Sequence, residues 1–157
     1  MCLEKRWPAG GPEWAAVGVL LRDGKTLLIK RVQRAGDPWS GQVAFPGGRW
    51  KPGEDLLGTA VREVEEEVGV TPRGLVGVLE PHSPRNAPWL KVVPFIFAEW
   101  DGEVAPNPSE VEEARWVSKA ELSEEEWISG YAFVHRDWVI WGLTYRILKR
   151  LIDCGLF

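Results

Sequence analysis

One short segment constrains the fold of this chain most strongly, because it combines a helical apolar pattern with a dense run of acid. Residues 62–69 read Arg-Glu-Val-Glu-Glu-Glu-Val-Gly, so that four glutamates occupy five consecutive positions. Like charges three or four residues apart destabilise a helix. A helix here therefore needs a compensating interaction, such as a buried apolar face or a bound cation.

The segment from Asp55 to Val68 has the pattern of an amphipathic helix. Asp55 is suited to cap its start, and Gly69 is suited to end it in the left-handed conformation that other residues avoid. The apolar residues recur at helical spacing, which predicts one buried face. The positions that share this face are Leu57, Ala60, Val61, Val64 and Val68.

At about 100° per residue, three of the four glutamates project from an arc beside the apolar face. They are Glu63, Glu66 and Glu67, whereas Glu65 points elsewhere. Two interpretations are open. A solvated acidic face is the commoner outcome for a charge run on a helix. Alternatively, carboxylates one turn apart form a platform for a hard divalent cation such as Mg²⁺ or Mn²⁺.

The rest of the chain predicts strands and further helices around this segment. Two apolar runs meet at Asp23-Gly24, which is a strong hairpin signal. Further strand patterns cover residues 43–45, 74–80, 89–100 and 114–118. Residues 118–130, with Ser118 as candidate cap, and residues 136–152 have helical spacing. We therefore expect one α/β (α+β) domain over residues 1–157, with helices packed on a mixed sheet.

Composition argues against several classes of protein. The formal net charge is -4 and no basic stripe is present, so nucleic-acid binding is not expected. The longest apolar run, residues 14–21, is too short to cross a bilayer, and the start of the sequence lacks a signal-peptide pattern. Cys2 and Cys154 are interpreted as two free thiols rather than a pair. These features predict a soluble cytoplasmic protein with no membrane partner.

The positions around the acidic helix match a known signature. Gly48, five residues, Glu54, seven residues and then residues 62–70 resemble the Nudix box, G-x5-E-x7-R-E-U-x-E-E-x-G-U, where U is aliphatic. Every specified position agrees, and the spacing contains no gap. The resemblance favours the metal platform over the solvated acidic face.

Membership of the Nudix hydrolases implies a fold, a reaction and a cofactor. The implied fold is an α/β/α sandwich with a mixed central sheet and a loop–helix–loop catalytic motif. The implied reaction is hydrolysis of a nucleoside diphosphate linked to another moiety, with Mg²⁺ or Mn²⁺ as cofactor. The implied metal ligands are Glu63, Glu66, Glu67 and the carbonyl group of Gly48. Arg62 and Glu54 would form the pair that orients the catalytic helix.

A general base must also accept the proton of the attacking water. Glu63 is one candidate. Another candidate is a glutamate in the loop before residues 114–118. Members of the family often carry a glutamate in a loop of this kind, although its position is not fixed. Glu110, Glu112 and Glu113 are available there, and we favour Glu110. The alternative for each is a loop acid that only faces solvent.

Several stretches outside the box resemble one branch of the family, the coenzyme A diphosphatases. Residues 41–48 match the G-x3-F-P-G-G half of its signature. Residues 90–97 and 138–148 resemble its valine-proline strand and its C-terminal helix. This resemblance predicts cleavage of coenzyme A or its derivatives to 3′,5′-ADP and 4′-phosphopantetheine. A broader range that includes ADP-ribose or dinucleoside polyphosphates is the alternative, and a non-catalytic nucleotide-binding module is a third.

The other half of the branch signature, L-L-T-x-R-[S/A]-x3-R, fits only in part. Arg31 agrees, whereas Ile29 and Val32 depart from it. The spacing from Arg31 to Gly41 is also one residue longer than the signature allows, and the position four before Gly41, where an arginine is expected, is Asp37. A missing arginine removes a contact to phosphate, which Arg31 or Arg34 could replace. The alternative for both arginines is a solvent-facing charge beside a strand.

Tryptophan is unusually frequent, with ten residues. Trp39 and Trp50 lie in the loops that flank the box, so they are candidates to stack on adenine. The other tryptophans are expected in the core or at an interface, which makes a homodimer a reasonable prediction.

Overall fold

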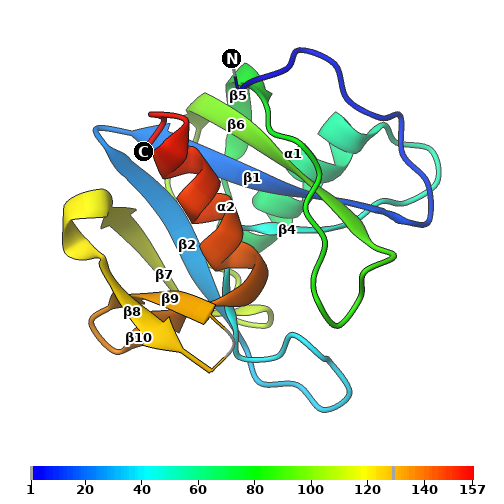
Figure 1. Ribbon diagram of the computed structural model, residues 1–157. Helices are drawn as coiled ribbons and strands as arrows, with labels where there is room; N and C mark the ends of the chain where they lie inside the picture. Colours follow the sequence, from blue (N-terminus) through cyan, green and yellow to red (C-terminus); the bar gives the residue numbers. More distant parts are fainter. Residues whose placement is uncertain (1, 129) are drawn as a thin grey trace.

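A mixed sheet forms the middle of the computed structural model, which describes residues 2–128 and 130–157 (Figure 1). Its central strand β1 (Trp14–Arg22) runs parallel to β6 (Lys91–Asp101) and antiparallel to β2 (Lys25–Arg31). The order β3-β2-β1-β6-β5 is completed by β3 (Val43–Ala44) and β5 (Thr71–Val78). Two further strands pair antiparallel with it: β4 (Gly47–Arg49) with β1, and β7 (Val111–Ser118) with β2.

Two helices cover opposite faces of this sheet, with α2 (Gly142–Asp153) in front and α1 (Leu56–Val68) behind in Figure 1. Alternate residues of a strand point to opposite faces. Leu20 of β1 accordingly belongs to the core cluster that contains α1, and Val19 belongs to the cluster that contains α2. The three layers form an α/β/α sandwich and confirm the predicted fold class. Neither helix of the described chain combines the length and hydrophobicity needed to cross a membrane.

The helix α1 begins and ends where the sequence predicts. The Asp55 carboxylate accepts a hydrogen bond from the Gly58 N–H at 2.9 Å, and Gly69 ends the helix at a φ of 76°. The predicted face differs in part: Leu57 and Val61 are only half-buried, whereas Glu67 is buried. The sheet side of this contact needs a glycine, because a Cβ at Gly18 would lie 2.5 Å from Val64 Cγ2.

The helix predicted over residues 118–130 is wrong. Only a short 3-10 turn, η1 (Lys119–Glu121), forms there, and β8 (Ser123–Trp127) follows it. β8 pairs antiparallel with β9 (Gly130–His135), and its described residues are all exposed. The glutamates of this stretch are good helix formers, but the pairing with β9 overrides that local preference.

The helix predicted over residues 136–152 begins later than expected. Its first part is β10 (Trp138–Ile140), which pairs with β9 and completes a second sheet of order β10-β9-β8. Trp138 and Ile140 are buried on one side of β10, so the apolar spacing there belongs to a strand. Gly142, with a φ of 64°, marks the change from strand to helix.

The two cysteines are bonded to each other, which corrects the prediction of free thiols. The Cα atoms of Cys2 and Cys154 are 5.9 Å apart, and their sulfur atoms form a disulfide across 152 positions of sequence. Both residues pack against the core cluster on the α2 side of the sheet. Glu4 brings the N-terminal segment there by exchanging backbone hydrogen bonds with Val78 of β5. The long separation of the two cysteines in sequence therefore does not keep them apart in the folded chain.

Candidate active site

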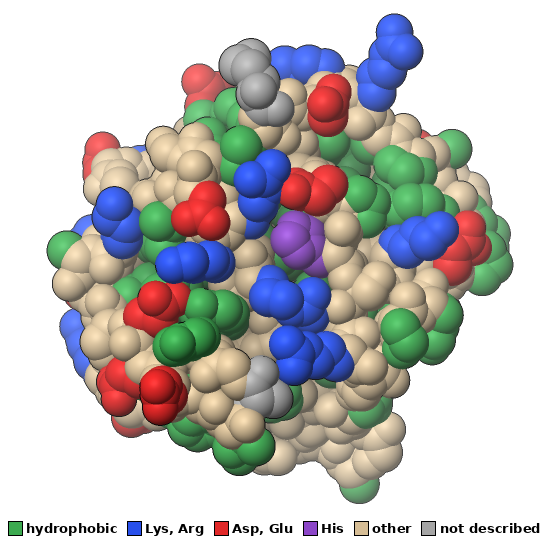
Figure 2. Space-filling model, in the orientation of Figure 1, with side chains coloured by type: hydrophobic (Ala, Val, Ile, Leu, Met, Phe, Trp, Pro, Cys, Tyr) green, Lys and Arg blue, Asp and Glu red, His purple; other side chains and the backbone are tan. Residues whose placement is uncertain are grey.

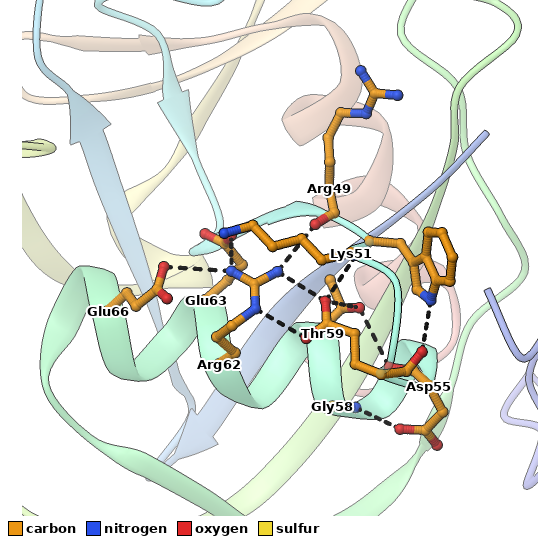
Figure 3. Close-up of polar contacts among 10 residues, drawn as sticks. Arg49, Lys51, Asp55, Gly58, Thr59, Arg62, Glu63 and Glu66 are labelled. Carbon is orange, nitrogen blue, oxygen red and sulfur yellow. Dashed lines mark hydrogen bonds and ion pairs between the residues drawn. The ribbon is translucent and has the colours of Figure 1, made fainter. Parts of the chain in front are cut away.

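Arg62 connects α1 to the loop that precedes it (Figure 3). Its guanidinium donates two parallel hydrogen bonds to the Glu54 carboxylate, from Nε at 3.0 Å and from Nη2 at 2.9 Å. Nη2 also donates to the carbonyl oxygen of Arg49 at 3.1 Å. The hydrogen bonds from Arg62 lower the pKa of Glu54 to about 2, against the effect of burial. Such bidentate pairs combine strength with a defined orientation, so this pair sets the position of the helix relative to the loop.

The positive charge of Arg62 also offsets much of the electrostatic repulsion among the glutamates of α1. Its Nη1 donates to Glu63 Oε1 at 2.6 Å and lies 3.4 Å from Glu66 Oε2 (Figure 3). A cationic side chain of the same helix therefore neutralises two of the crowded carboxylates, alongside the buried apolar face. The Glu63 side chain is largely buried, whereas that of Glu66 remains 46% exposed.

Glu67 is the most unusual acid of the helix, because it is 3% exposed. Its Oε1 accepts a hydrogen bond from the Gly47 N–H at 2.7 Å, but no ion pair to a described side chain accompanies it. Burial raises the pKa of Glu67 to about 8, and the nearby charge of Glu63 adds to this effect. A carboxylate held in this way gains from a cation placed beside it.

The glycines of β4 allow the backbone to approach these acids. A Cβ at Gly48 would lie 2.5 Å from the carboxyl carbon of Glu63, so a larger residue there would displace the end of the Glu63 side chain. At Gly47 a Cβ would lie 2.4 Å from the carbonyl oxygen of Ala16. The box glycine therefore has a steric reason that is independent of any turn conformation.

The donors at this site fit a hard divalent cation in chemistry. Carboxylates and a backbone carbonyl are the ligands that such ions prefer. The described residues contain no ready-made group of three or more His, Cys, Asp or Glu side chains that could hold an ion. Glu63 and Glu66 instead bind Arg62, so both would have to turn away from it to complete a ligand set.

A small acidic cavity of about 200 Å³ opens beside the helix. Glu63, Glu67 and Glu110 line it, together with Gly47 and Gly48. The three loop acids considered from the sequence are thereby separated. Glu112 lies 3.4 Å from Lys30, and Glu113 binds Arg115 at 2.6 Å, so both are turned to other partners outside this cavity.

Arg31 and Arg34 line the same cavity as the glutamates. Arg31 Nη2 lies 2.7 Å from Asp37 Oδ2, and Arg34 Nη2 donates to the carbonyl oxygen of Ser109 at 2.5 Å. Asp37 occupies the position at which the branch signature has an arginine. Asp37 therefore does more than leave out a positive charge, because its carboxylate also partly neutralises Arg31.

A second cavity of about 680 Å³ adjoins the first and shares Arg31, Gly47 and Gly48 with it. Trp39, a candidate to stack on adenine, lines this larger cavity. Trp50 lines neither cavity. Its indole N–H donates to the carbonyl oxygen of Glu54 at 2.7 Å, and its ring packs against the core cluster on the α1 side. We therefore assign Trp50 to support of the box loop.

Much of the larger cavity comes from residues that the sequence did not single out. Its walls also contain Arg49, Arg85, Trp127, Tyr131, Trp141 and Arg146. Apart from Arg49, which follows Gly48 inside the box, these residues lie in strands, loops and a helix far from the box in sequence. Nothing in the local pattern of any one segment connects it to the others, and only the fold brings them together.

The fold and this loop–helix unit define the class of protein: an α/β/α sandwich with acids from one helix beside a glycine-rich strand. Residues 12–138 match the family described as NUDIX domain. Nudix hydrolase 22, chloroplastic, of Arabidopsis thaliana is 35% identical over 88% of this chain and 54% of its own length. An uncharacterised Nudix hydrolase of Yersinia pestis, NudL, is 33% identical over 86% of this chain and 75% of its own.

Solved structures agree with these sequence matches. The MutT NUDIX hydrolase from Burkholderia pseudomallei has a TM-score of 0.58 at 27% identity, over 76% of this chain and 93% of that one. A NUDIX hydrolase from Nitrosomonas europaea is similar in fold, with a TM-score of 0.65 at 22% identity, over 90% and 70% of the two chains. The chain belongs to the Nudix hydrolase family. Nudix hydrolases generally use divalent metal ions and act on small nucleotide substrates. The chain spans about half the length of the Arabidopsis relative.

Proposed function

We propose that this protein hydrolyses the diphosphate linkage of a nucleoside diphosphate derivative, with coenzyme A or its derivatives as preferred substrate. The observation that carries the proposal is the junction of the two cavities at Gly47, Gly48 and Arg31. A diphosphate at this junction would face the acids of the small cavity. The large cavity of about 680 Å³ would hold the nucleoside part, and its volume lies in the usual range for ligand sites.

The chain's own residues suit this chemistry. In the proposed active arrangement Glu63, Glu66, Glu67 and the Gly48 carbonyl would hold Mg²⁺ or Mn²⁺. The bound cation would offset phosphate charge and lower the pKa of a water molecule. Arg62 would then keep its bidentate pair with Glu54 and so preserve the position of the helix.

Proton transfer needs a carboxylate near the attacking water. We propose Glu110 for this role, because it lines the acidic cavity together with Glu63 and Glu67. Glu63 is the alternative base. Arg31 and Arg34 lie where they can contact phosphate oxygens, and Trp39 lies where it can stack on a base.

Two observations bear on the choice of substrate. The stretch shared with the coenzyme A branch, residues 41–48, includes the glycines at the junction and the buried Phe45. This supports a substrate of the coenzyme A type. The ion pair between Arg31 and Asp37 favours a second candidate function, hydrolysis of ADP-ribose or dinucleoside polyphosphates, because it weakens one phosphate contact.

The domain organisation, the oligomeric state and the cellular location of the protein are further predictions. We propose that residues 1–157 form one Nudix domain, because the Cys2–Cys154 disulfide joins the two ends of the chain. A homodimer and a cytoplasmic location are still predicted. The disulfide removes one reason for the cytoplasmic prediction, since such bonds are rare in reducing compartments.

A product assay tests the proposal. Coenzyme A, ADP-ribose and diadenosine polyphosphates should be offered side by side, in Mg²⁺, in Mn²⁺ and with a chelator. We expect metal-dependent release of 3′,5′-ADP and 4′-phosphopantetheine, with coenzyme A preferred. Equal rates on all three would reject the preference, and binding without turnover of any of them would indicate a non-catalytic module.

Two substitutions separate the roles of the acids. Glu66→Gln should abolish metal-dependent turnover, and Glu110→Gln should lower kcat by about 10²–10⁴-fold if Glu110 is the base. Glu112→Gln is the matched control, because Glu112 lies two residues further along, in β7, and pairs with Lys30 instead. Near-normal turnover by the Glu110 variant would transfer the role of base to Glu63.

A further inference from the structure

The large cavity is also lined by a pair of arginines that the proposed chemistry does not use. Arg146 lies in the second turn of α2, and Arg85 lies in the loop before β6; both line the cavity. Arg146 Nη2 donates to the carbonyl oxygen of Ser83 at 2.8 Å, which holds the side chain against the same loop. On the face that α2 occupies, Figure 2 shows basic side chains gathered near the centre.

Arg146 lacks the counter-charge that the other helix arginine has. Among the described residues no carboxylate lies within ion-pairing distance of Arg146, and its buried Nε has no hydrogen-bond partner. One turn further along the helix, Arg150 Nε binds Glu80 at 2.6 Å. Burial lowers the pKa of Arg146, and the positive charge of Arg85 lowers it further. Two cations thus share a partly buried wall, an arrangement that an anion would stabilise.

The position of this pair relates it to the diphosphate site. Its cavity is the one that meets the acidic cavity at Gly47 and Gly48, so one ligand could occupy both. The rest of its lining is largely apolar and aromatic and includes Trp39 and Leu143. These surfaces together suit a ligand that carries a diphosphate, a nucleoside and a second anionic group.

We propose that Arg146, together with Arg85, binds a phosphate monoester carried on the nucleoside part of the substrate, separate from the diphosphate that is cleaved. The inference rests on the proposed function and deepens it, because it selects nucleotides with an additional phosphate. Guanidinium groups bind phosphate through paired, charge-assisted hydrogen bonds. The additional phosphate should therefore improve kcat/KM by about tenfold to hundredfold.

The test compares two substrates that differ only in this phosphate, coenzyme A and 3′-dephospho-coenzyme A. Wild-type protein should prefer coenzyme A, and Arg146→Gln should abolish most of the preference. Arg150→Gln is the matched control, since Arg150 lies on the same helix but outside the cavity, and it should retain the preference. The ratio of the two kcat/KM values does not depend on the folded fraction of a variant. An unchanged ratio in Arg146→Gln would overturn the inference.

A binding measurement keeps this test separate from the proposed function. Adenosine 3′,5′-bisphosphate and 5′-AMP can be titrated calorimetrically into wild-type protein and Arg146→Gln. Tighter binding of the bisphosphate by wild type alone supports the subsite even if no diphosphate is cleaved, in which case only the proposed function fails. Equal affinities of wild type for both nucleotides reject the subsite, whatever the protein hydrolyses.

Discussion

Replacing Glu67 by glutamine should stabilise the metal-free protein above about pH 5 and, under the proposed mechanism, slow its turnover. The pKa of Glu67 rises from an ordinary value of 4.5 to about 8 on folding, chiefly because the carboxyl is buried. Folding therefore favours the protonated form, and stability is lost as the pH rises from 4.5 to about 8. Glutamine has a similar volume and can still accept the hydrogen bond from Gly47.

The size of the effect follows from the same shift. At about 1.4 kcal/mol per pH unit, the full penalty is about 5 kcal/mol, and relaxation around the charge should reduce the measured value to about 2–4 kcal/mol. Saturating Mg²⁺ should reduce or cancel the difference, because an ion at 100 times its Kd adds about 2.7 kcal/mol to the protein that binds it.

The assay is urea unfolding of both proteins at pH 4, 6 and 8, with a chelator and with Mg²⁺. Glu65→Gln is the control on the same helix; Glu65 is exposed, so its change should stay within about 0.5 kcal/mol. A difference between wild type and Glu67→Gln that is independent of pH would refute the reasoning. So would a lower stability of the variant at pH 8 in chelator.

Three further predictions concern the scaffold of the site. Glu54, whose pKa is lowered to about 2 by its hydrogen bonds, should contribute stability that is lost as the pH falls from 4.5 to about 2; Glu54→Gln should flatten this acid limb of a urea-unfolding series by up to about 3 kcal/mol, and an equally steep limb would contradict the assignment. Replacing both Cys2 and Cys154 by serine should lower the free energy of unfolding by up to about 5 kcal/mol, because the disulfide closes a loop of 152 positions. Calorimetry should show a lower Tm for this variant than for the disulfide-bonded wild type. Gly18→Ala should cost about 1–3 kcal/mol and reduce kcat, because its Cβ would press on Val64 and displace the catalytic helix; an unchanged Tm would show that the helix adjusts freely.

Local interactions explain why the catalytic helix was predictable. Its caps, Asp55 and Gly69, act within one turn of the helix ends, and the apolar spacing reports a face without reference to the partner. The hairpin of β1 and β2 was predictable for the same reason, because a two-residue turn brings neighbouring strands together. The prediction for residues 118–130 was wrong because β8 has no buried face, so its sequence has no apolar alternation that would indicate a strand. The glutamates of this stretch also favour a helix.

The identity and spacing of the box residues determined the family and the helix, since both depend on chemistry within a few turns of chain. Of the three acids that the spacing singled out, Glu63 and Glu67 line the acidic cavity and Glu66 does not. The tertiary structure alone decided that Arg62 binds Glu54, Glu63 and Glu66, that Glu67 is buried, and that Glu110 rather than its neighbours lines the acidic cavity. It also decided that the two cysteines are paired and that Arg85 and Arg146 line one cavity. These outcomes depend on distances between segments far apart in sequence, and such distances are set by the packing of the whole sheet and its helices.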